Sequence, residues 1–197
     1  MIHTICFIVA LAVSLSASLS YSAESSNLTR HEPFIRQAFQ VAATAAKKGD
    51  HPFGALLVYR NSVILTAGNT VYTDKNVHSH AEINLMTEAR RTIAPEVLRE
   101  STLYVSTAPC MLCCSSMWAR GIGRVVYGVS YTTFSKITGV SDNSLPCDRL
   151  YRETGKALEW IGPVLEEEGA KVFYYWPHDP SRAAIVKNLG LMGITPP

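Results

Sequence analysis

Two short segments, about thirty residues apart, place three metal-binding side chains and one carboxylate in a fixed order. Residues 80–82 read His-Ala-Glu, and residues 109–113 read Pro-Cys-Met-Leu-Cys. Imidazole nitrogen and thiolate sulfur are ligands that Zn²⁺ takes in proteins, and a nearby carboxylate that is not a ligand can move protons. The pattern therefore predicts a zinc site made by His80, Cys110 and Cys113, with Glu82 as the catalytic residue.

The spacing of these residues favours two helix N-termini that face each other. Cys110 and Cys113 are three residues apart, which on a helix places both sulfurs on one face. Pro109 suits the start of that helix, and a helix N-terminus favours the thiolate form of cysteine. His80 is expected in the first turn of a second helix, with Ser79 as its N-cap. Three protein ligands leave the fourth tetrahedral position open, which is typical of catalytic zinc.

Other interpretations of the same residues stay open at this level. A Cys-x-x-Cys pair by itself also occurs in redox dithiols and in structural zinc sites. Cys114 or Cys147 could close the site as a fourth ligand, in which case the zinc would be structural. The upstream His-Ala-Glu segment favours the catalytic interpretation, because neither a redox dithiol nor a structural zinc site requires Glu82.

Composition is that of one globular domain with a weak overall charge. The chain has 197 residues, of which 47% are hydrophobic and 17% are charged, and its formal net charge is +2. This length is enough to bury a core. Because lysine and arginine form no dense stripe, long-range attraction for nucleic acid is expected to be modest, and nucleic acid is an unfavoured partner.

The N-terminal segment resembles a secretory signal peptide. Residues 5–19 are almost entirely apolar or small, and serine-rich sequence follows to Ser26. Such a stretch is short for a membrane span and precedes small residues suited to cleavage. We therefore predict a signal peptide over 1–22, a single zinc-dependent domain over 23–197, and a secreted or periplasmic protein. The segment has no lysine or arginine, so an uncleaved anchor, or a misplaced start codon with a cytoplasmic protein, is the alternative.

Two cysteines outside the metal pattern have no role fixed by the sequence. In an oxidising compartment Cys114 and Cys147 could form a disulfide, but sequence does not give the distance between them. Two buried free thiols are the slightly favoured interpretation.

Hydrophobic periodicity and turn residues predict alternating helices and strands after an initial hairpin. This order implies a three-layer α/β/α sandwich with a central mixed sheet of about five strands. A loop is expected over 133–146, and loops at such positions often border pockets. The expected helices are about 29–48, 79–93, 110–119 and 181–191, and the expected strands are 53–59, 63–68, 102–107, 124–129 and 171–176, with a short amphipathic piece at 158–168.

Several motifs together resemble the cytidine deaminase-like superfamily, in the branch of guanine, cytosine and tRNA-adenosine deaminases. The segments that carry the resemblance occur in the expected order and cover roughly residues 33–130. A weaker likeness, over 161–166, is to bacterial proteins called nucleoside deaminases. The segments are 51–55 (His-Pro-Phe-Gly-Ala), Asn69, 80–83 (His-Ala-Glu-Ile), 106–113 (Ser-Thr-Ala-Pro-Cys-Met-Leu-Cys) and 124–128 (Arg-Val-Val-Tyr-Gly).

The resemblance implies roles for four further residues in substrate binding. Asn69 would hydrogen-bond the base, Phe53 would line the pocket, and the backbone near Ala55 and Ala108 would read the base edge. Phe53 could equally be a core residue, and asparagine is also common at a strand end such as position 69. Many relatives have glutamate where this chain has Ala108, which puts substrate recognition in doubt. Asp142 and Asp148 could replace that acceptor, although solvated loop carboxylates are the simpler explanation.

The predicted activity is zinc-dependent hydrolytic deamination of a nucleobase or nucleoside with release of ammonia. A guanine-like purine is the first expected substrate and a cytosine-like base the next. A tRNA adenosine deaminase and a non-catalytic zinc protein of the same fold are the alternatives. The resemblance also implies a homodimer.

Overall fold

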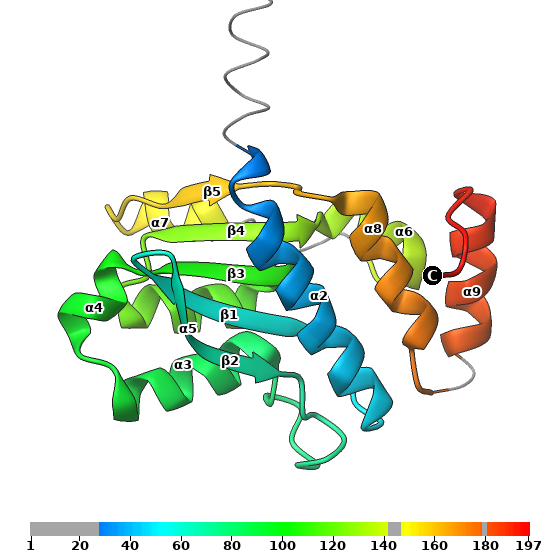
Figure 1. Cartoon of the computed structure of the whole chain (residues 1–197), viewed down its shortest axis with the longest axis horizontal. Coiled ribbons are helices and arrows are strands. Elements are labelled where there is room, and N and C mark those ends of the chain that lie inside the picture. The colour runs from blue at the N-terminus through cyan, green and yellow to red at the C-terminus, as the bar shows by residue number, and fades with distance from the viewer. Residues whose placement is uncertain (1–27, 142–146, 179–180) are drawn as a thin grey trace, which may run out of the picture. The chain divides into compact units, whose positions relative to one another are not determined.

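A five-stranded mixed sheet forms the centre of the computed structural model, which describes residues 28–141, 147–178 and 181–197 (Figure 1). Its strand order is β2-β1-β3-β4-β5. β1 runs antiparallel to both of its neighbours, whereas β3, β4 and β5 are parallel to one another. The predicted mixed sheet is confirmed. The strands are β1 (Gly54–Tyr59), β2 (Ser62–Gly68), β3 (Thr102–Thr107), β4 (Arg124–Val129) and β5 (Glu159–Ile161).

Helices cover both faces of this sheet, as the predicted three-layer sandwich requires (Figure 1). The chain divides into residues 1–32 and 33–197, and the architecture described below belongs to the second unit. The helices are α2 (Glu32–Lys47), α3 (Ala81–Thr92), α4 (Pro95–Glu100), α5 (Met111–Arg120), α6 (Tyr131–Thr138), α7 (Cys147–Glu153), α8 (Glu166–Ala170), the 3₁₀ helix η1 (Lys171–Tyr175) and α9 (Ser181–Leu191). In the part of the chain that the structure describes, no helix combines the length and apolar content needed to cross a bilayer.

The helix α2 lies unusually close to one face of the sheet. A Cβ atom on Gly54 of β1 would lie 2.5 Å from the carbonyl oxygen of Ala38 and 2.7 Å from the amide nitrogen of Ala42. Only glycine fits such an approach of helix backbone to strand backbone. Gly128 of β4 similarly makes room for the ring of Phe39. These contacts hold β1 against α2, and Gly54 at the start of β1 lines the cavity described below.

The opposite face of the sheet carries the main apolar core and the two helices of the metal pattern. Alternate strand residues point toward α3 and α5, as the two-residue period of a strand requires. Leu85 on α3 and Met117 on α5 pack against them and are almost fully buried. The sheet residues of this core include Ala55, Leu57, Leu103, Val105, Val125 and Tyr127.

Two segments fold differently from the sequence-based prediction. Part of the expected loop at 133–146 is helix α6, which Ser130 caps by accepting a hydrogen bond from the amide of Thr133 and which Gly139 ends in the left-handed conformation. Residues 142–146, with Asp142, lie outside the described residues. The expected strand at 171–176 is the 3₁₀ helix η1, because β5 already pairs with β4 and the η1 ring of Phe173 packs in a separate core with α6 and α9.

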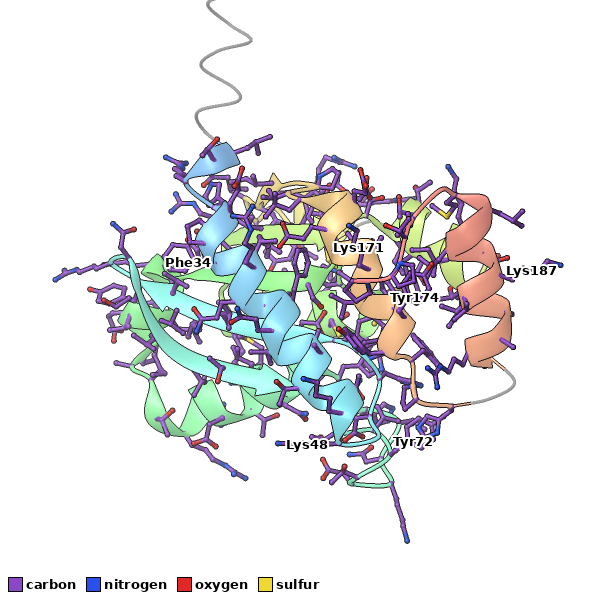
Figure 2. The ribbon with its side chains drawn as sticks, turned by 45° about the vertical axis from the view of Figure 1, so that its right-hand side comes forward. Phe34, Lys48, Tyr72, Lys171, Tyr174 and Lys187 are labelled. Carbon is purple, nitrogen blue, oxygen red and sulfur yellow. A yellow bond between two sulfur atoms is a disulfide. The ribbon has the colours of Figure 1, made fainter. Side chains whose placement is uncertain are left out.

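This second core joins the C-terminal part of the chain to the sheet. Val129, Ile137, Ile185 and Leu189 are its buried centre. Figure 2 places Tyr174 between the ribbons of η1 and α9, and its hydroxyl donates to the carbonyl oxygen of Ile194 at 2.7 Å. The core therefore holds Phe173, Tyr174 and Trp176 beside α6, and local sequence periodicity does not predict this arrangement.

Cys114 and Cys147 form a disulfide, with a Cα–Cα distance of 5.3 Å. The slight preference for two free thiols is therefore wrong. The bond connects α5 to α7, and the two cysteines are 33 positions apart in the sequence. Sequence periodicity does not predict whether residues so far apart come within bonding distance. Both cysteines are consequently excluded as a fourth zinc ligand, which removes the closed structural site that these two residues offered.

Replacing Cys147 by serine is expected to lower the free energy of unfolding by about 3–4 kcal/mol, because a loop of this length is no longer constrained in the unfolded chain. Zinc content should not change, since neither sulfur belongs to the metal site. Urea unfolding of the two proteins, with zinc measured on the same samples, tests both statements. Equal stability with and without a reducing agent that cleaves the bond would contradict the first.

Candidate active site

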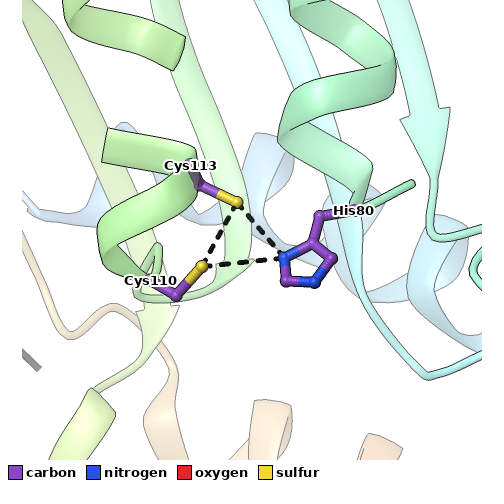
Figure 3. Close-up of side chains that lie close together, drawn as sticks. All are labelled: His80, Cys110 and Cys113. Carbon is purple, nitrogen blue, oxygen red and sulfur yellow. Dashed lines mark hydrogen bonds between the residues drawn. The ribbon is translucent and has the colours of Figure 1, made fainter. Parts of the chain in front are cut away.

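His80, Cys110 and Cys113 converge on one point between the N-termini of α3 and α5 (Figure 3). The Nδ1 atom of His80 lies 3.6 Å from the sulfur of Cys110 and 3.4 Å from that of Cys113. The two sulfurs are 3.6 Å apart. Donor atoms around a tetrahedral zinc ion lie about 3.5–3.8 Å from one another, given Zn–N and Zn–S distances of about 2.0–2.3 Å. The donor set therefore fits zinc.

Two of the three ligands occupy the N-cap positions of their helices. His80 precedes Ala81 of α3, and Cys110 precedes Met111 of α5; neither side chain caps its own helix by a hydrogen bond. Ser79 was expected as the first N-cap, and the structure moves the cap by one residue. Because neither side chain makes a capping hydrogen bond, both remain available as metal ligands.

The two thiols and the imidazole stabilise one another electrostatically. The hydrogen bond between the two sulfurs lowers the pKa of Cys110 to about 4, and the neighbouring His80 contributes to the same shift. The same hydrogen bond, together with burial, raises the pKa of Cys113. The hydrogen bond with Cys110 raises the pKa of His80. A thiolate beside a buried thiol and an imidazole is a site prepared for a cation.

Glu82 is buried beside this site rather than paired with a cationic side chain. Its exposed fraction is 8%, and burial, together with the nearby Cys110, raises the pKa of its carboxyl group to about 7. A carboxyl group with such a pKa can both accept and donate a proton near neutral pH. Its position two residues after His80 places it next to the metal ligands without making it one of them.

The loop that leads into His80 is held by two polar side chains. The amide of Asn84 donates to the carbonyl oxygen of Gly68 at 2.9 Å and to the hydroxyl of Thr70 at 2.8 Å. Asp50 accepts hydrogen bonds from the backbone of Tyr72 and Thr73, and although burial opposes its ionisation, these bonds lower its pKa. The loop conformation, and with it the place of His80, therefore depends on contacts outside the motif.

A cavity of about 320 Å³ opens directly onto the metal site. Pockets that hold small molecules begin at about this size and are mostly apolar with a few polar groups. Ser106 contributes a hydroxyl that accepts a hydrogen bond from the amide of Gly54 at 3.0 Å. The described residues of the lining are His51, Phe53, Gly54, His80, Glu82, Ser106, Thr107, Ala108, Cys110, Tyr131, Phe134, Val140 and Trp176, and among them are one carboxylate and no lysine or arginine.

Of the four residues assigned to substrate binding, the structure places two in the cavity lining and two outside it. Phe53 and Ala108 line the cavity, although the amide of Ala108 already donates to the carbonyl oxygen of Val129 at 2.8 Å. Asn69 is buried outside the cavity lining, and its Oδ1 accepts a hydrogen bond from the amide of Val71 at 3.1 Å. Ala55 is fully buried one residue behind Gly54 in β1. The roles of all four residues in substrate binding stay predictions.

Sequence reasoning did not assign the aromatic wall of the cavity to the site. Trp176 and His51, from opposite ends of the domain, lie with ring centroids 4.6 Å apart. Phe134 and Tyr131 come from α6, in and just before the segment expected as a pocket-bordering loop. The tyrosine-rich run that ends at Trp176 was the available signal, but it was interpreted as a strand. Asp148, the other candidate acceptor, does not line the cavity and pairs with Arg152 at 3.0 Å.

Comparison with known proteins agrees with this geometry. The family model described as the cytidine and deoxycytidylate deaminase zinc-binding region matches residues 28–129, about half of the chain. Given this match, together with the relatives described next, the chain belongs to the cytidine and deoxycytidylate deaminase family. It is accordingly a zinc-dependent hydrolase that acts as a deaminase.

Its relatives act on different substrates according to their names. A probable cytosine deaminase of Schizosaccharomyces pombe is 36% identical over 146 residues, which are 68% of this chain and 85% of that protein. The tRNA-specific adenosine deaminase of Bacillus subtilis is 30% identical over 141 residues, or 72% and 84% of the two chains. Relatives at similar distances therefore differ in substrate class, and the family alone does not select among them.

Solved structures give the same fold. A structure from work on tRNA:A34 deaminases superposes with a TM-score of 0.60 at 25% identity, over 72% of this chain and 99% of that one. A guanine deaminase of Nitrosomonas europaea has a TM-score of 0.61 over 79% and 82% of the two chains. At 15% identity, the second likeness concerns the fold alone.

Proposed function

We propose that this deaminase acts on a free aminated nucleobase or nucleoside, with a guanine-like purine as the first substrate and a cytosine-like base as the second. The observation that carries the proposal is the cavity of about 320 Å³ beside Glu82, walled by aromatic rings and without lysine or arginine in its lining. Such a cavity suits an uncharged planar ring that stacks on aromatic side chains.

Glu82 is the proton-transfer group of the proposed reaction. A zinc ion held by His80, Cys110 and Cys113 would supply Lewis-acid activation of water. The Glu82 carboxylate would accept a proton from water in the cavity, deliver it to a ring nitrogen of the substrate, and later protonate the departing amine. Water adds to the ring carbon and ammonia leaves, so the amino group is exchanged for a carbonyl oxygen without a redox change.

The charge distribution supports a small substrate over a transfer RNA. Protein contacts to a polynucleotide are dominated by lysine and arginine at the phosphates. The cavity lining has neither, and the final helix α9 offers only Arg182 and Lys187. Base deamination in tRNA is the second candidate, because relatives at 30–36% identity carry that name.

Two observations favour different bases within the small-molecule class. The residues 52–55 and Asn69 resemble the guanine deaminase branch, and the cavity has room for a bicyclic ring. Ala108 stands where many relatives have glutamate, which favours a base that does not need an acidic acceptor there, and the relative from Schizosaccharomyces pombe is named a probable cytosine deaminase.

A substrate panel tests the proposal directly. Ammonia release should be measured with the zinc-loaded protein on guanine, cytosine, adenine, their nucleosides and one tRNA. We expect turnover on at least one free base or nucleoside and none on the tRNA. Turnover on tRNA alone would replace the proposal by RNA editing. No turnover on any member, with zinc present, would favour a non-catalytic zinc protein of the same fold.

Export is a separate part of the proposal. The disulfide between Cys114 and Cys147 is of a kind found mainly outside the cytoplasm, which supports the predicted signal peptide over 1–22, a segment outside the described residues. Expression of the full chain followed by mass measurement of the mature N-terminus tests it. Recovery of the intact N-terminus in the cytoplasmic fraction would contradict export.

A further inference from the structure

His51 is a cavity-lining imidazole to which the proposed reaction gives no role. It lies three residues before β1 and lines the cavity together with Glu82 and Trp176. Among the described residues, its side chain makes ring contacts but neither ring nitrogen has a hydrogen-bond partner. A polar group that faces a cavity with its hydrogen-bonding capacity unused is available to a ligand.

Aromatic packing fixes the orientation of the His51 ring. It lies against Trp176 with centroids 4.6 Å apart and planes inclined by 32°. The ring of Tyr72 meets it edge-on at 5.0 Å, and that of Phe53 at 6.2 Å. Three aromatic neighbours therefore hold the imidazole in place before any ligand binds, so that a hydrogen bond to a ligand costs little side-chain entropy.

The imidazole is uncharged under ordinary conditions. Burial, together with the nearby rings of His178 and His80, lowers the pKa of His51 to about 4 against the opposing effect of Asp50. A neutral imidazole carries one N–H donor and one nitrogen acceptor. It can therefore bind an uncharged carbonyl or ring N–H without the desolvation cost of a buried cation.

Several polar groups of the cavity already have a partner or an assigned role. The hydroxyl of Ser106 accepts a hydrogen bond from Gly54, and the amide of Ala108 donates to Val129. His80 and Cys110 belong to the metal site, and Glu82 is the proton-transfer group. The ring nitrogens of His51 are therefore among the groups left for the edge of a base that points away from the metal.

We propose that His51 is a specificity-determining residue that hydrogen-bonds the carbonyl or ring N–H edge of an uncharged aminated heterocycle, stacked on the wall that Trp176 and Phe53 form. This inference rests on the proposed function, because it assigns an edge of the proposed substrate to a side chain of the same cavity. It predicts that His51 acts mainly on substrate binding and not on proton transfer.

The central variant is His51→Phe, which keeps an aromatic ring against Trp176 and removes both nitrogens. We expect KM for the base identified by the panel to rise about ten- to hundredfold, as loss of a buried hydrogen bond requires, with kcat within about threefold and zinc content unchanged. His51→Gln, which restores a donor and an acceptor, should recover part of the loss. Unchanged KM in His51→Phe would overturn the inference.

A matched control is His178→Phe. His178 is the adjacent imidazole, with ring centroid 6.4 Å from that of His51, but it does not line the cavity and its Nε2 already contacts the carbonyl oxygen of Gly49 at 2.7 Å. Its replacement should leave KM within about threefold. An equal rise of KM in both variants, or a loss of zinc and of thermal stability in both His51 variants, would mean a packing role and would overturn the inference.

Substrate analogues identify the edge that is recognised. 2-Aminopurine lacks both the carbonyl of guanine and the ring N–H beside it, and 4-aminopyrimidine lacks the same two groups of cytosine. The unaltered protein should prefer the parent base over its analogue, and His51→Phe should lose that preference. If the preference for the parent survives unchanged in the variant, another group recognises that edge and the inference is overturned.

The same variants distinguish failure of this inference from failure of the proposed function. Where the unaltered protein deaminates a base and His51→Phe does so with equal KM, only the inference fails. Where the panel shows no turnover, equilibrium binding of guanine and cytosine to the zinc-loaded protein replaces kinetics. Weaker binding by His51→Phe then supports the inference without the reaction, whereas equal affinity, or no binding to the unaltered protein, overturns it.

Discussion

Replacing Glu82 by glutamine is expected to leave about one zinc ion per chain and to reduce turnover by a hundredfold or more. Positioned acid–base groups typically contribute about 10²–10⁴-fold. Glutamine has nearly the shape of glutamate but no ionisable proton, so the variant tests proton transfer and not packing. Because Glu82 is buried beside the ligands and is not one of them, the metal site should survive. Zinc analysis and ammonia release on the same preparation measure both effects.

The matched control for this variant is Glu88→Gln on the same helix. Glu88 is a surface carboxylate that forms an ion pair with Arg91, 3.9 Å away and also exposed. Its replacement should change neither zinc content nor turnover by more than about twofold, since exposed pairs contribute little. Normal turnover in Glu82→Gln would remove Glu82 from the mechanism, and loss of zinc in that variant would make Glu82 part of the metal site.

Replacing Cys113 by alanine is expected to abolish stoichiometric zinc binding and to lower stability together. Cys113 is buried and supplies one of only three protein donors, at 3.4–3.6 Å from the other two donor atoms. A metal that binds only the folded chain stabilises it, by about 4 kcal/mol at a thousand times Kd. The variant should therefore lose the increase in Tm that added zinc gives to the unaltered protein. Thermal melts with and without zinc measure this.

Ser115→Ala provides the comparison for Cys113→Ala. Ser115 lies on the exposed side of the same helix, where its hydroxyl bonds back to the carbonyl oxygen of Met111 at 3.0 Å. This replacement also removes a small polar side chain from α5, but it should keep one zinc ion per chain and the zinc-dependent increase in Tm. If Cys113→Ala binds zinc as tightly as this control, the assignment of ligands is wrong.

The elements with strong local signals were predictable from sequence. Thr102–Thr107 and Arg124–Val129 are strands with the predicted bounds, and Ser181–Leu191 is the predicted helix. Runs of β-branched residues, helix caps and glycine stops are local properties that one chain segment carries by itself. The metal site was predictable for the same reason, because each of its two segments carries both the ligand types and the helix start that orients them.

Elements whose conformation depends on neighbours were not predictable in this way. The run over Lys171–Tyr175 has the composition of a strand, but β5 occupies the edge of the sheet beside β4 and leaves the run to pack as a 3₁₀ helix. α6 contains serine and threonine, which local rules assign to loops, and its apolar side packs against α9. Tertiary contacts override propensity in such segments.

The sequence by itself thus indicated the candidate metal ligands, the carboxylate next to them and the class of reaction, since these follow from residue types at short spacing. Only the tertiary structure decided which side chains face the substrate. The rings of His51 and Trp176 are 125 positions apart in the chain, but their centroids lie 4.6 Å apart at the cavity. Cys114 and Cys147 are likewise distant in sequence and form a disulfide in the fold. Contacts between distant residues depend on how sheet and helices pack, and no local pattern encodes that packing.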